Sequence, residues 1–147
     1  MGEAVPVPRL SNRIKRLYLL MSRSVDDSLK PHGLARGQWQ VLAHVHDAGT
    51  LSQRRLQESM KIESATLTVI VDLLVAKGWL ERLPDPADKR CRLLRFTPDG
   101  VVRWRDVPDP IARVEQRMLG GLDLGERSVV GDAVERMIAG LDRERKA

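Results

Sequence analysis

The stretch 51–97 constrains the fold more than any other part of the 147-residue sequence. Its first helix is expected over Ser52–Met60, because serine is a favoured N-cap whose hydroxyl accepts a free backbone N–H. Lys61-Ile62 makes a tight turn, and a second helix over residues 63–77 ends at Gly78, where glycine supplies the left-handed closing residue. Two short helices joined by so short a turn predict a helix-turn-helix.

The second helix has two unlike faces. Helical spacing gives it an apolar stripe for the core, made of Leu67, Ile70, Val71 and Leu74. A rotation of about 100° per residue puts a small, largely neutral set on the opposite side: Ala65, Thr66, Thr68, Val69 and Asp72. Such a face suits the floor of the DNA major groove, where hydroxyls meet base edges and methyl groups meet thymine. The alternative is an ordinary polar helix surface.

A charged hairpin follows the second helix. Trp79–Leu83 is expected to be a strand, Pro84–Arg90 a polar loop, and Cys91–Phe96 the returning strand. Side chains alternate between the two faces of a strand, so Leu94 and Phe96 are both expected to point inward. An arginine at the hairpin tip has the size and charge to enter a narrow minor groove. The sequence therefore predicts a winged helix-turn-helix, a mainly α fold with a small β-hairpin wing (α+β).

The same stretch resembles the MarR family of bacterial transcriptional regulators. The resemblance is carried by the helix start Leu51-Ser52, the helix end Lys77-Gly78, and the wing pattern Arg82, Asp85-Pro86, Asp88-Lys89-Arg90 and Phe96-Thr97-Pro98-Asp99-Gly100. It implies a homodimeric factor that binds double-stranded DNA, usually a repressor, and that is often released by a small ligand. A twofold dimer presents two recognition helices about one DNA turn apart, which predicts a pseudo-palindromic operator.

The resemblance also implies which residues contact DNA. Arg90 is expected in the minor groove with Asp88 orienting it, although Arg90 could instead be solvated or paired with Asp88. Phosphate contacts add affinity without sequence information, and they are expected from Arg82, Lys89 and Arg92. Residues near helix starts add Gln38, Ser52, Gln53 and Arg54, and the recognition helix 63–77 adds Ser64, Ala65, Thr66, Thr68 and Val69. The family often has arginine where Val69 stands, so a thymine-methyl contact is expected here.

Helices flank the winged core on both sides. After an extended arm, residues 1–8, a helix over Arg9–Lys30 carries an apolar stripe made of Leu10, Ile14, Leu17, Met21, Val25 and Leu29. This stripe can cover the core of its own chain or form a dimer interface, and we favour the interface. A helix over Arg36–Asp47 follows, with candidate inward residues Trp39, Leu42, Ala43 and His46.

The C-terminal part is also predicted to be helical. A helix should start at Thr97-Pro98 and run to about Leu119, with a kink or break near Asp106–Pro110 because prolines interrupt helices. The final helix follows an Asp123/Glu126 capping box and carries the stripe Val130, Val134, Met137, Ile138 and Leu141. We therefore divide the chain into a dimerisation arm and helix (1–34), a DNA-binding domain (35–97) and C-terminal dimerisation helices (98–147).

Relatives of this kind bind effectors, often small aromatic carboxylates, between the first helix, the second helix and the helix after the wing. The resemblance therefore implies a small aromatic or phenolic effector. The side chains that this neighbourhood offers are Tyr18, Trp39, His44, Trp104 and Arg105. A core role is the alternative for Trp39.

Composition narrows the remaining function classes. The net charge of +5 is compatible with nucleic acid, an anionic membrane or an acidic protein partner, and alone it does not choose among them. His44 and His46 point about 200° apart on a helix and cannot share a metal ion. Cys91 is the single cysteine, and nearby cations could lower its pKa, although a small-residue role is the plainer interpretation.

Enzyme and membrane functions are not expected. Asp85 and Asp88 lie on a hairpin tip without a cleft, and no nucleophile or phosphate-loop motif occurs, so we expect no catalysis, metal or cofactor. The absence of a long apolar run predicts a cytoplasmic protein without a membrane partner. One alternative stays open: a winged-helix protein-interaction module that does not read DNA.

Overall fold

The computed structural model describes residues 9–146, so the expected extended arm, residues 1–8, lies outside the described residues. The chain divides into two compact units, with the boundary in the sequence between Pro110 and Ile111. The first unit therefore holds the N-terminal helix and the helix after the wing together with the winged core. The second unit holds the C-terminal helices.

Helix α1 (Leu10–Leu29) ends in a short 3₁₀ turn, η1 (Lys30–His32), that Gly33 closes with a φ of 65°. Its expected apolar stripe is divided between two environments. Val25 and Leu29 are buried in the first unit, whereas Leu10, Ile14 and Leu17 are exposed. Covering the core of its own chain therefore explains only the C-terminal part of the stripe.

Helix α2 (Arg36–Ala48) is fastened to α1 by Arg36, whose guanidinium donates to Ser22 and to the carboxylate of Asp26, 3.0 Å away. Its predicted inward face was partly wrong. The buried residues are Gln38, Val41, Leu42 and Val45, so that Leu42 alone was assigned correctly. Trp39 and Ala43 are half-buried and His46 is exposed, because the side of α2 that packs against α4, β1 and β3 is the one that carries Val41 and Val45.

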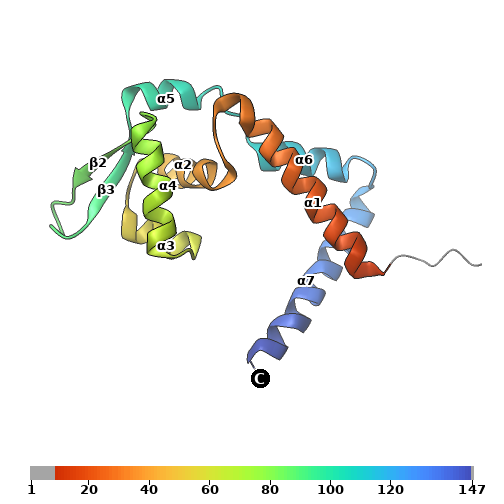
Figure 1. Cartoon of the computed structure of the whole chain (residues 1–147). Helices are drawn as coiled ribbons and strands as arrows, with labels where there is room; N and C mark the ends of the chain where they lie inside the picture. The colour runs from red at the N-terminus through yellow and green to blue at the C-terminus, as the bar shows by residue number, and fades with distance from the viewer. Residues whose placement is uncertain (1–8, 147) are drawn as a thin grey trace, which may run out of the picture. The chain divides into compact units, whose positions relative to one another are not determined.

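The two helices of the predicted helix-turn-helix are confirmed as α3 (Gln53–Met60) and α4 (Ser64–Ala76). The Ser52 hydroxyl caps α3 by accepting the Arg55 N–H at 3.2 Å, and Gly78 follows α4 with a φ of 76°. In the core, α4 packs against α2 through the buried residues Leu67, Val71 and Leu74. Figure 1 shows one end of α4 next to α3, with the hairpin of β2 and β3 extending to the left of α4.

The sheet has three strands rather than the expected two. Strands β2 (Leu80–Pro84) and β3 (Arg92–Phe96) form the hairpin, and a strand that was not predicted, β1 (Thr50–Ser52), pairs with the other side of β3. Three residues are too few to display a period of two, so β1 has no recognisable sequence pattern. Leu94 is buried at the centre of this sheet, as predicted, and Phe96 is half-buried.

The prolines break the helix after the wing, as predicted. Helix α5 (Pro98–Trp104) ends well before α6 (Pro110–Leu119) begins. The Thr97 hydroxyl caps α5 by accepting the Gly100 N–H at 2.9 Å, and it donates to the Gly78 carbonyl at 2.6 Å. These two hydrogen bonds of Thr97 fix the start of α5 against Gly78, in the turn between α4 and β2.

In the second unit, α7 (Leu124–Lys146) begins at the predicted capping box. The Asp123 N–H donates to Glu126 and the Glu126 N–H donates to Asp123, both at 2.9 Å. The stripe expected on this helix is exposed, from Val130 to Leu141. Within residues 9–146, none of the helices has the length and apolarity that a membrane crossing requires.

Candidate nucleic-acid interface

The outward face of α4 has the composition that the sequence predicted. Ala65, Thr66 and Asp72 are exposed, Thr68 is half-buried, and 60% of the Val69 surface is accessible. Leu73, which was not among the expected residues, continues this face one turn later and is 46% exposed. The centre of the face is therefore apolar as well as uncharged.

The Thr68 hydroxyl is used inside the protein. It donates to the Ser64 carbonyl at 2.9 Å and accepts from the Gln53 side-chain amide at 3.2 Å. Gln53 was expected to contact a phosphate, and this bond shows that it also ties the first turn of α3 to α4. Ser64 occupies the first position of α4, where its carbonyl serves the same network.

The wing tip is shaped by two aspartates that accept backbone hydrogen bonds. Asp85 accepts from the Ala87 N–H and Asp88 from the Arg90 N–H, each at 2.9 Å. Asp88 therefore bonds to the backbone of Arg90. Among the described residues, no ion pair joins their side chains.

Exposed cations remain at this tip. Lys89, Arg90 and Arg92 all have exposed side chains. In contrast, Arg82 forms an ion pair with Asp72 of α4 at 2.5 Å, and Arg95 pairs with Glu81 of the neighbouring strand at 2.5 Å. The expected phosphate role of Arg82 thus competes with a bond that links the wing to α4.

Two of the expected phosphate contacts near helix starts have other partners. Gln38 is only 8% exposed; its Oε1 accepts from the Ala35 N–H at 3.1 Å and from Lys77 Nζ at 3.3 Å. The prediction that Gln38 contacts DNA is therefore not supported, because its amide caps α2 from inside. Arg54 is exposed and pairs with Glu58 one turn along α3, at 3.4 Å.

The environment of Cys91 reverses the expected effect on its thiol. Its Sγ donates to Asp88 Oδ2 at 3.5 Å. This hydrogen bond, with partial burial and the negative charges of Asp88 and Asp85, raises the pKa of the Cys91 thiol, and Arg54 opposes the shift only in part. The expectation that cations lower this pKa was wrong, because the hydrogen bond to Asp88, partial burial and the two carboxylates together outweigh the opposing charge of Arg54.

Three of the five expected effector residues line two cavities that share Trp104. One cavity of about 220 Å³ lies between α2, β3 and α5 and includes Arg105. The other, of about 310 Å³, includes Trp39 and residues Val107–Asp109 of the break after α5. Trp104 stacks near Phe96 and His46, with ring centroids 5.6 and 5.7 Å apart respectively.

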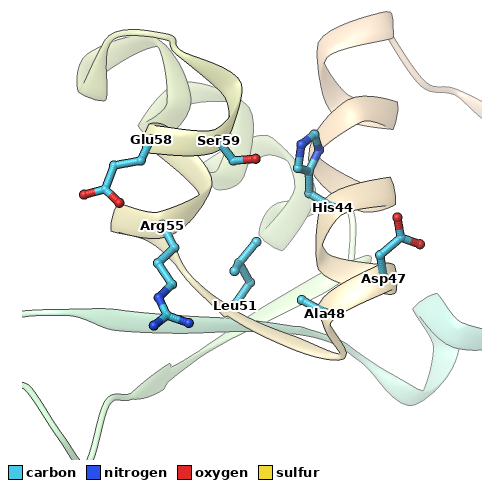
Figure 2. A pocket seen from close by; sticks show the side chains of 7 residues that line it. All are labelled: His44, Asp47, Ala48, Leu51, Arg55, Glu58 and Ser59. Atoms are coloured by element: carbon cyan, nitrogen blue, oxygen red, sulfur yellow. The ribbon is translucent and has the colours of Figure 1, made fainter.

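His44 and Tyr18 lie elsewhere. Figure 2 shows His44 and Asp47 of α2 across an open hollow from three α3 residues, Arg55, Glu58 and Ser59, with Leu51 between them. The Tyr18 side chain is 61% exposed on α1. Over the described part of the chain, no group of three or more histidine, cysteine or acidic side chains is arranged to hold a metal ion.

Two cations that the sequence analysis missed hold the end of α4. Lys77 Nζ donates to the Gly33 carbonyl at 2.8 Å, besides its contact with Gln38. Arg103 of α5 donates to the Lys77 carbonyl at 2.9 Å, and its guanidinium lies 3.8 Å above the centre of the Trp79 ring. Lys77 and Arg103 are far in sequence from the groups that they bind, so no local sequence pattern could have predicted these contacts.

Comparison with known proteins agrees with this geometry. The sequence matches the model of the MarR family over residues 34–91. It is 34% identical over 100 residues to the multiple antibiotic resistance protein MarR of Salmonella typhimurium, covering 68% of this chain and 67% of that protein. It is 30% identical over 102 residues to the transcriptional repressor NicR of Pseudomonas putida, covering 69% of this chain and 64% of NicR.

A mutant MarR of Escherichia coli, solved in complex with operator DNA, has the same fold. Its TM-score to this chain is 0.75 at 25% identity, over 87% of this chain and 92% of that one. The relatives are transcriptional regulators and not enzymes. The winged helix-turn-helix and the extent of these matches lead to one conclusion: the chain belongs to the MarR family of DNA-binding transcriptional regulators.

Proposed function

We propose that the protein is a homodimeric repressor of a pseudo-palindromic operator. Residues 63–77 of each chain enter the major groove, and the wing, residues 82–95, reaches the minor groove. The observation that carries the proposal is the uncharged centre of the outward α4 face beside a wing tip with three exposed cations. A helix face without negative charge can approach base edges closely, and cations on the wing can bind the neighbouring phosphates.

Arg90 is the proposed minor-groove residue. Its backbone is held by Asp88, and within the described structure its guanidinium enters no ion pair, so it is available to the DNA. Lys89 and Arg92 are proposed to contact phosphates on either side. Residues near the starts of α3 and α4 are proposed to contact the DNA backbone or base edges: Ser52, Gln53, Arg54, Ser64 and Thr66. Arg82 could make such a contact only after its ion pair with Asp72 breaks.

Dimerisation is proposed from the exposed apolar side chains of two separate helices. On α1 these include Leu10, Ile14 and Leu17, and on α7 they include Val134 and Ile138. Apolar surface of this extent in water favours association with a second copy. We place the dimer in the cytoplasm with its operator.

A small effector is proposed to bind beside Trp104. The two cavities that share this ring offer aromatic and aliphatic walls, with Arg105 exposed at one of them. Such a lining suits a small aromatic acid, because the ring stacks on aromatic side chains and the cation attracts the carboxylate.

The test is fluorescence anisotropy with labelled DNA from upstream of the protein's own gene and a scrambled duplex as comparison. Binding should favour the upstream duplex and weaken steeply from about 50 to 200 mM salt, because several phosphate counterions are released. Arg90→Ala should lose about 5- to 150-fold in affinity for each wing, since a base-specific groove contact is worth about 1–3 kcal/mol. Far-UV circular dichroism checks that the variant is folded.

Arg136→Ala is the matched control, because it removes the same charge from an exposed position on α7. It should leave both affinity and salt dependence unchanged. If Arg90→Ala binds as tightly as the wild type, the wing mechanism is wrong. If neither duplex is bound even at low salt, the protein is instead a winged-helix module that docks on other proteins.

A further inference from the structure

The outward face of α4 presents methyl groups where a DNA-reading helix often presents polar side chains. Ala65, Val69 and Leu73 follow one another at intervals of four residues along this face. Val69 and Leu73 are 60% and 46% exposed, whereas Leu67, Val71 and Leu74 on the opposite side of α4 are fully buried. This helix is therefore apolar on both sides, and about half of its outer apolar row stays accessible in the described part of the chain.

Hydrogen-bonding groups near the centre of this face already have partners. The Thr68 hydroxyl gives its proton to the Ser64 carbonyl and accepts from Gln53, so its methyl group is what remains for a ligand. The Asp72 carboxylate is bound by Arg82 at 2.5 Å, so both charged groups at this end of the face already have a partner. Thr66, at the edge, is the exposed hydroxyl that is left.

Only one base offers a methyl group in the major groove. Thymine carries its C5-methyl there, whereas guanine, cytosine and adenine present hydrogen-bonding groups that an apolar side chain cannot match. The cations of the wing tip, Lys89, Arg90 and Arg92, lie in the same DNA-binding module and favour a polyanion over an apolar protein partner for this face.

We propose that Val69, flanked by Ala65, contacts the C5-methyl group of a thymine in each operator half-site and makes that position specific for thymine. This inference rests on the proposed function, because it requires α4 to lie in the major groove. Val69 is the specificity-determining residue, and Ala65 leaves room for the base to approach.

The experiment begins by selecting duplexes from a randomised library with the full-length protein. Each thymine of the selected site is then replaced, one at a time, by uracil, which differs only in lacking the C5-methyl. At one thymine in each half-site the wild type should bind the uracil duplex about fourfold more weakly, corresponding to about 0.8 kcal/mol for one buried carbon. Val69→Ala should bind both duplexes with nearly equal affinity.

Val102→Ala is the matched control, since Val102 is 58% exposed on α5 and loses the same two methyl groups. It should keep the fourfold preference for thymine. Sites that are selected and bound tightly, but are indifferent to uracil at every thymine, would overturn the inference and leave the repressor proposal standing. A library from which no sequence is enriched would overturn both.

Discussion

Gly100 is the position where one added methyl group should cost the most stability. A Cβ built there would lie 2.3 Å from the Trp79 carbonyl oxygen and 3.1 Å from the Thr97 hydroxyl. The Trp79 carbonyl belongs to the backbone just before β2, and the Thr97 hydroxyl is held by its capping bonds, so neither can rotate away. Helix α5 must therefore move by about 1 Å to restore van der Waals distance. That movement strains the 2.6 Å bond from Thr97 to Gly78 and the bond from the Thr97 N–H to the Trp79 carbonyl.

The expected loss follows from these contacts. Overpacking costs about 1–3 kcal/mol and a weakened hydrogen bond about 1 kcal/mol, offset by up to about 1 kcal/mol from the better helix propensity of alanine. Gly100→Ala should therefore lower the free energy of unfolding by about 1–3 kcal/mol in urea denaturation at fixed protein concentration. Gly121→Ala, whose Cβ meets no atom within 4 Å, should change it little or raise it slightly. A Gly100→Ala protein as stable as the wild type would refute the close approach.

Two further changes test single contacts. Arg103→Gln removes the bond to the Lys77 carbonyl and the stacking on Trp79, so the free energy of unfolding should fall by about 1–2 kcal/mol in thermal denaturation, and an unchanged melting temperature would contradict the contact. The raised pKa of Cys91 lowers its thiolate fraction at any given pH below it, so alkylation by iodoacetamide at neutral pH should be slower than for an ordinary thiol. Asp88→Asn should accelerate it, and equal rates in both proteins would show that Asp88 does not control the thiol.

Local signals were enough to predict most of the helices. Caps act within one turn, so Ser52 and Thr97 marked the starts of α3 and α5 before any tertiary contact was known. Pro108 and Pro110 predicted the break after α5, which is also a local effect. Each proline lacks the backbone N–H that a helix needs, and its ring clashes with the preceding turn. These features could be read from neighbouring residues alone.

Tertiary contacts decided what the sequence could not. The inward face of α2 depended on packing against several elements, and it buries Val41 and Val45 while Trp39, which was expected to be inward, is half-buried. Arg82 and Asp72 are ten residues apart on different elements, so their ion pair has no local pattern. Of the candidate site, the composition of the α4 face and the exposed wing cations followed from the sequence, but the internal role of Gln38 did not.

The polar residues around α4 orient this helix, and the methyl groups are left to face the ligand. Near its start, Gln53 and Thr68 join it to α3. Near its middle, Asp72 joins it to the wing through Arg82, and at its end the Lys77 carbonyl accepts from Arg103 of α5. A helix held from three elements loses little further freedom on binding, so weak apolar contacts with bases can contribute affinity without a large ordering cost. The same bonds support the proposed recognition role of a helix with so few free polar groups on its outer face: in that proposal the supporting contacts position α4, and the exposed carbon atoms discriminate between bases.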